Sequence, residues 1–72
     1  MNVQDIKVDD EICGWIYNVH ERGVQLHTGK VLRIYYPEKD WLYQSLDFVI
    51  RDNDTGYEET IMQRNITDHI AK

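Results

Sequence analysis

Residues 24–36, VQLHTGKVLRIYY, decide how this chain is expected to fold. The first part, 24–28, alternates apolar and polar residues, as a half-buried β-strand does. Residues 31–36 are rich in β-branched and aromatic side chains, which also favour strands. Between them, the Thr-Gly-Lys at 28–30 has the composition of a tight turn. The stretch therefore predicts two antiparallel strands joined as a hairpin.

The preceding segment, EICGWIYNVH at 11–20, predicts another strand because β-branched and aromatic residues dominate it. A glycine inside a strand, here Gly14, often marks a bulge or a bend. The sequence HERG that follows is a turn signal. Residues 1–10 are polar and acidic, and they fit either a short edge strand or a frayed arm.

The following segment, PEKDWLYQSL at 37–46, predicts a short helix, since proline suits the first helical position and acidic residues suit the first turn. Residues 47–64 predict a hairpin around the turn sequence DNDTG. The last residues, 65–72, fit either one helical turn or a short closing strand.

This order, β-β-β-α-β-β, predicts a single mainly β domain over 1–72, built as a small five-stranded antiparallel barrel. The order matches the OB-fold, which has a helix between its third and fourth strands. An SH3-like barrel is the closest alternative, and an open sheet covered by one helix is the third. The residues expected in the core are Trp15, Tyr17, Val24, Leu26, Ile34, Tyr36, Leu42, Leu46 and Phe48.

The composition excludes several classes of protein. The chain has 72 residues, a net charge of −5 and one cysteine. An acidic chain does not attract nucleic acid through its overall field. A single cysteine forms no internal disulfide, which favours a reducing compartment. No apolar run reaches the ~18 residues of a membrane span, and the polar N-terminus does not resemble a signal peptide. We therefore expect a complete small cytoplasmic protein.

No motif predicts an enzyme, a metal site or a cofactor. The acidic stretch 52–59 has oxygen ligands at alternate positions, but its glycine and glutamate do not match the spacing of an EF-hand loop. The pair His20 and His27 flanks the first turn, and with Cys13 it lacks zinc-ligand spacing. We expect surface histidines and a buried, inert Cys13 thiol.

Protein binding is the favoured function. The helix at 37–46 would place Trp41 and Tyr43 near its start, and such aromatic residues are enriched at interface centres. The second hairpin adds an acidic surface at Asp54, Glu58 and Glu59, which suits a partner with a basic surface. The chain is expected to be an inhibitor or an accessory subunit, of a kind typical of phages and mobile elements.

The alternative function is binding of single-stranded nucleic acid on an OB-like face. The residues expected on that face include Arg33, Tyr35 and Arg51, an aromatic side chain for base stacking and two cations for phosphates. Nearby acidic residues oppose this interpretation. Pairing of open strand edges between copies would instead produce a homo-oligomer.

Overall fold

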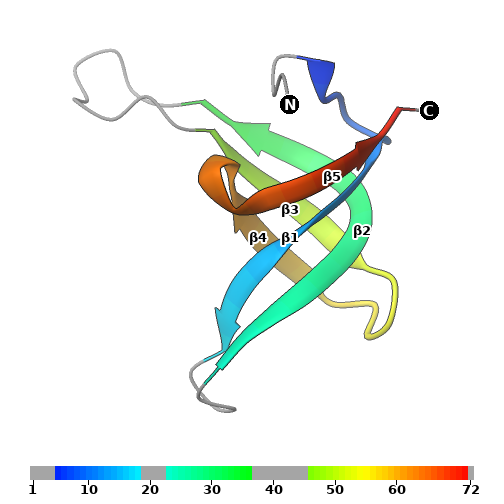
Figure 1. The fold of residues 1–72 in the computed structure, drawn as a ribbon. Helices are drawn as coiled ribbons and strands as arrows, with labels where there is room; N and C mark the ends of the chain where they lie inside the picture. Colours follow the sequence, from blue (N-terminus) through cyan, green and yellow to red (C-terminus); the bar gives the residue numbers. More distant parts are fainter. Residues whose placement is uncertain (1–4, 19–22, 37–45, 72) are drawn as a thin grey trace.

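The fold is mainly β, as predicted, with five antiparallel strands in one sheet. The computed structural model describes residues 5–18, 23–36 and 46–71. The strands are Glu11–Asn18 (β1), Gly23–Tyr35 (β2), Asp47–Asp52 (β3), Glu58–Met62 (β4) and Ile66–Ile70 (β5), with a 3-10 helix, η2, at Gln63–Asn65 (Figure 1).

The strand order is β4-β3-β2-β1-β5. Four strands follow one another as a meander, and the chain then returns through η2 to pair β5 with β1. The sheet is strongly curled, so that β1 and β5 lie in front of β3 and β4 in Figure 1. Its concave side encloses the core.

The expected turn at 28–30 is wrong, because β2 runs through it as one strand of 13 residues. Gly29 pairs with Ile12 of β1 on one side and Asp52 of β3 on the other. A Cβ at Gly29 would lie 2.7 Å from the carbonyl carbon of Arg51 and would overlap its oxygen. The glycine thus permits close approach of two strands. Two expected strands merge into β2, and residues 66–70 supply the fifth strand.

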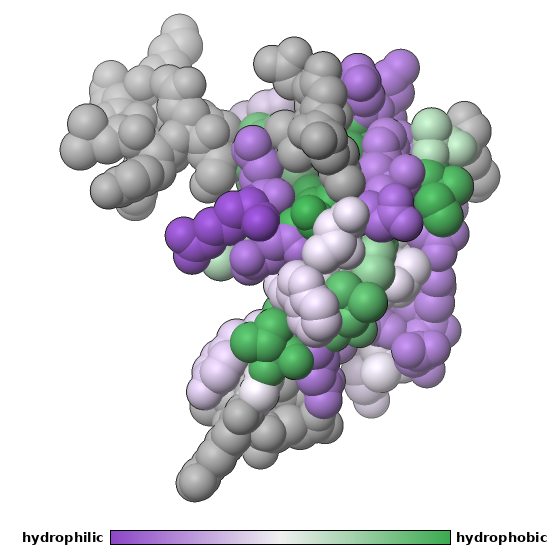
Figure 2. Space-filling view, in the orientation of Figure 1, coloured by the Kyte–Doolittle hydropathy of each residue, from purple (hydrophilic) through white to green (hydrophobic). Residues whose placement is uncertain are grey.

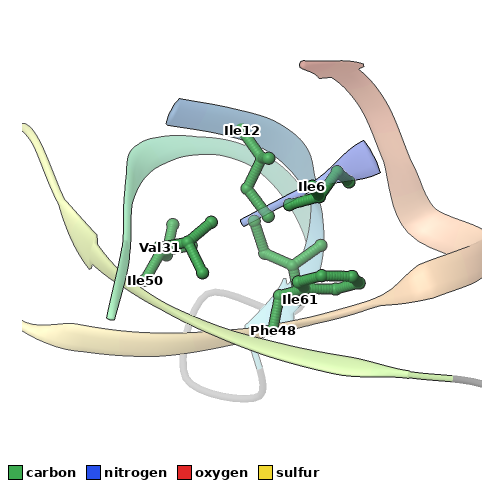
Figure 3. Packing of buried hydrophobic residues seen from close by; sticks show 6 residues of the cluster. All are labelled: Ile6, Ile12, Val31, Phe48, Ile50 and Ile61. Carbon is green, nitrogen blue, oxygen red and sulfur yellow. The ribbon is translucent and has the colours of Figure 1, made fainter. Parts of the chain in front are cut away.

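The core is a cluster of buried aliphatic side chains around one aromatic ring (Figure 3). Its members are Ile6, Ile12, Val31, Phe48, Ile50 and Ile61. Phe48 lies within a row formed with Ile34 and Ile61 across three strands. The core positions predicted for Ile34, Leu46 and Phe48 are confirmed, the first two as half-buried residues packed against the cluster.

The predicted inner face of β1 is wrong. Its buried or half-buried side is Ile12, Gly14 and Ile16, whereas Trp15 and Tyr17 are exposed. The cause is a close approach at Gly14, where a Cβ would lie 2.5 Å from Ile61 Cγ2 and 2.8 Å from the Asn65 carbonyl oxygen. Only the face of β1 that carries Gly14 can therefore pack against β4 and η2. The bulge expected at Gly14 is confirmed in the pairing with β5.

Three further expected core residues, Val24, Leu26 and Tyr36, are also exposed, the last by 72%. The predicted helix at 37–46, with Leu42, Trp41 and Tyr43, lies outside the described residues except for Leu46.

Residues ahead of β1 also pack on the sheet. Ile6 is buried in the core, and Val31 is bonded to both Asp9 and Asp10 through backbone hydrogen bonds of 2.9 and 2.8 Å. Within the described ranges, no helix is long and apolar enough to cross a membrane.

Candidate protein-binding surface

The hairpin of β1 and β2 extends beyond the rest of the sheet. The last pair of β1 with β5 is Gly14 with Ile66, and the pairing of β2 with β3 begins at Gly29. Residues 15–18 and 23–26 therefore form a two-stranded segment without a third strand among the described residues, which we call the aromatic ribbon. It projects at the lower left of Figure 1.

One face of the aromatic ribbon is an exposed apolar block. Cross-strand pairs bring Trp15 opposite Leu26 and Tyr17 opposite Val24. Directly opposite residues point to the same side of an antiparallel pair, so these four side chains are neighbours. Their exposed fractions are 43% for Trp15, 50% for Leu26, 62% for Tyr17 and 58% for Val24. In Figure 2, hydrophobic and weakly polar residues gather over this part of the hairpin.

The block is as large as an apolar patch that often has a function. With roughly half of each side chain accessible, it exposes about 400 Å², comparable to the largest apolar patch on a typical monomer. Such patches mark interaction sites more often than isolated exposed apolar residues do. Because Trp15, Tyr17 and Leu26 were predicted to belong to the core, this surface was not predicted from the sequence. The glycine at position 14, between Cys13 and Trp15, was the available signal of which face is inside.

The residues of the candidate nucleic-acid face are exposed, but both of its arginines already have partners within the chain. Arg33, Tyr35 and Arg51 lie on the outer side of β2 and β3 and are exposed. Arg33 forms an ion pair with Glu58 of β4, and the hydrogen bond to Glu58, followed by that to Tyr35, raises the pKa of the guanidinium. Arg51 Nη1 donates to the Gly56 carbonyl oxygen at 2.9 Å.

The acidic surface predicted on the second hairpin and the nucleic-acid face thus meet at one residue. Glu58 belongs to both through its ion pair with Arg33. Glu59 is half-buried opposite Ile50, whereas Asp54 is exposed on the turn. Of the three acids, only Asp54 is exposed without an ion pair among the residues that the structure describes. The other predicted contacts, Trp41 and Tyr43, lie outside those residues.

A shallow hollow of about 410 Å³ lies between Lys30 and Arg51, with Asp52 in its wall. Two cations beside a hollow are the starting point of an anion site. Here Lys30 Nζ lies 3.1 Å from Asp9 Oδ1, and Arg51 contacts Gly56. The local charge is already balanced, so the hollow gives no support for phosphate binding.

Two histidine–aspartate pairs with buried carboxylates tie distant segments together. His27 Nδ1 bonds to Asp52, and His69 Nε2 bonds to Asp10 Oδ2 at 2.8 Å. The expectation of surface histidines is wrong for His27 and His69, whose side chains are 15% and 12% exposed. His20 lies outside the described residues.

The Asp52 carboxylate also holds the turn between β3 and β4. Its Oδ1 accepts the backbone N–H groups of Asp54 at 2.7 Å and Thr55 at 3.3 Å. Burial is the largest single influence on this group and raises its pKa, but the hydrogen bonds from His27 and the turn together outweigh burial and lower the pKa. Asp52 is therefore an anion that holds the turn between β3 and β4 in place.

The described residues contain no group of three or more His, Cys, Asp or Glu side chains placed to hold a metal ion. Cys13 is half-buried, and its Sγ accepts a hydrogen bond from Thr28 Oγ1 at 3.1 Å.

Comparison with known proteins adds no relative: no protein family, curated protein or solved structure matches this chain. Its function is therefore inferred from the surface itself.

Proposed function

We propose that this chain is a non-enzymatic protein-binding module and that the aromatic ribbon is its contact surface. The observation that carries the proposal is the exposed block of Trp15, Tyr17, Val24 and Leu26. Tryptophan and tyrosine dominate the binding energy of protein interfaces, because each presents a large apolar area with few rotatable bonds.

The charge of the chain favours a basic partner. Its net charge is −5, and the exposed acids Asp54 and Asp68 have no ion pair among the described residues. Such acids around an apolar centre would steer a partner whose contact surface carries lysine or arginine. We propose that the module acts in the cytoplasm as an inhibitor or accessory subunit, in keeping with its single cysteine.

Single-stranded nucleic acid is the second candidate ligand, supported by the exposed Tyr35 beside Arg33. The ion pair between Arg33 and Glu58 weakens this case, because phosphate would have to compete with a carboxylate that is already in place.

The test is capture from host lysate on the immobilised protein, with and without nuclease, using matched variants. Trp15→Ala and Tyr17→Ala should each reduce retention of the bound protein by at least tenfold, as expected for hot-spot residues. Tyr57→Ala is the control, because Tyr57 is 72% exposed and lies outside the ribbon. It should retain the partner fully.

Two results would overturn the proposal. One is retention that does not change in the Trp15 and Tyr17 variants while all variants unfold at the same temperature as the parent. The other is retained nucleic acid that is lost with nuclease and with Arg33→Ala, which would move the site to the face of Arg33, Tyr35 and Arg51.

A further inference from the structure

The aromatic ribbon has a second property, which lies in its backbone. Hydrogen-bonding groups of successive residues in a strand point alternately to its two sides. Val31 N–H bonds to Asp10, on the β1 side, whereas the Thr28 carbonyl accepts from Asn53, on the β3 side. Pairing with β1 is regular from Gly23 to Lys30. The N–H and C=O groups of Val24 and Leu26 therefore point away from β1, where no described strand pairs with them.

This edge lacks the usual protection against strand addition. Exposed edges normally carry charges, proline or bulges that prevent pairing with another chain. The sequence at 23–28, GVQLHT, has no Asp, Glu, Lys, Arg or proline, and its pairing with β1 has no register shift. The edge strand β4 carries Glu58 and Glu59, and the edge strand β5 carries Asp68. The open edge of β2 is thus the least protected of the three.

We propose that an extended segment of a partner protein adds to this edge as a β-strand. The inference rests on the proposed function, since the edge belongs to the aromatic ribbon. Val24 and Leu26 would supply both the backbone hydrogen bonds and, on the outer face, part of the apolar block. In strand addition the main chain provides affinity and alternate side chains provide specificity. The partner segment therefore carries apolar residues at every second position.

The position of the edge also specifies a charge on the partner. The added strand would lie beside β2 as a continuation of β3, whose pairing with β2 ends at Asp52. One end of it would meet the turn after β3, where Asn53 N–H already bonds to Thr28 and where Asp54 is exposed. A lysine or arginine at that end of the segment complements Asp54.

A second copy of this chain fits the edge poorly. Two copies would each bring a net charge of −5, which opposes their association. A different protein with a basic, extended segment is instead attracted by this charge.

The probe is a seven-residue peptide of alternating valine and threonine, with lysine at each end and both termini blocked. Binding to the ¹⁵N-labelled protein is followed by NMR. We expect saturable binding, with hydrogen exchange of the Val24 and Leu26 amides slowed at least tenfold. A lack of binding at millimolar peptide, or slowed exchange confined to other strands, would overturn the proposal.

Backbone substitution separates strand addition from side-chain docking. Leu26→Pro removes an N–H that faces away from β1, so the ladder with β1 stays complete. Its control is Leu26→Ala, which loses the side chain but keeps the N–H. We expect peptide affinity to fall at least tenfold in the proline variant relative to the alanine variant. If the proline variant does not fold, exchange in the parent protein still decides the question.

Two other results would contradict strand addition at the open edge of β2. Equal affinity of the two Leu26 variants, together with loss in Trp15→Ala, would overturn strand addition and leave the protein-binding function standing. A dimer detected by sedimentation in the absence of peptide, and abolished by Leu26→Pro, would assign the edge to a second copy and overturn the proposal.

Discussion

Replacement of Gly29 by alanine tests the close packing of β2 against β3. The added Cβ would overlap the Arg51 carbonyl oxygen, which is backbone and cannot rotate away as a side chain can. The two strands must separate, and overpacking of this kind costs about 1–3 kcal/mol. Each ladder hydrogen bond lost adds about 1 kcal/mol. Reduced freedom of the unfolded chain offsets about 0.4–1 kcal/mol.

The net destabilisation expected for Gly29→Ala is about 2–3 kcal/mol. A chain of this length has a total stability of about 4–11 kcal/mol, so the effect is a large share of it. Urea unfolding followed by circular dichroism measures it, and with a slope near 1 kcal/mol/M the midpoint should fall by about 2–3 M.

The control for this measurement is Lys30→Ala, at the exposed neighbouring position, which should shift the free energy of unfolding by no more than about 0.5 kcal/mol. Equal urea midpoints for Gly29→Ala and the parent protein would refute the reasoning. They would mean that β2 and β3 have room for a Cβ at position 29, contrary to the overlap with the Arg51 carbonyl oxygen.

Two other changes probe the interior. Since its folded pKa is lowered, Asp52 contributes stability above its ordinary pKa, and this contribution is lost as the pH falls through the lower folded pKa. Melting temperatures should therefore fall in acid, and Asp52→Asn should flatten that part of the profile; an unchanged profile would contradict the assignment. Phe48→Ala removes a fully buried ring and should cost about 3–5 kcal/mol, measured by the same urea titration. A cost under about 1 kcal/mol would show that Phe48 is not central to the core.

The class of fold could be predicted from local patterns. The hairpin of β3 and β4 follows from its turn sequence at 52–56, and the alternation around Phe48 and Ile50 identifies the inner face, because the opposite positions include Arg51. The irregularity at Gly14 was also predicted, since glycine in a strand interior often marks a bulge, a bend or a close approach.

The face of β1 could not be predicted from alternation, because apolar residues occupy both of its sides, and Gly14 was the one signal available. Alternation then indicates a strand without saying which side is buried, and assigning the larger aromatics to the core reverses the answer. A second ambiguity concerns Gly29. A glycine that permits a turn and one that permits close approach look the same in a single sequence, and only the position of β3 distinguishes them. The exposed face of the aromatic ribbon was missed for the first of these reasons.

The pairing of β5 with β1 has a consequence for how the chain folds. His69 pairs with Ile12 in the sheet and bonds to Asp10, which is 59 residues earlier in the sequence. A large loop must close before that contact can form, and folds dominated by such long-range contacts fold in milliseconds to seconds. During synthesis, β1 lacks one of its two neighbours until residues 66–70 have left the ribosome. Until then, the edge of β1 that later pairs with β5 is exposed, and chaperones or other chains can bind to it.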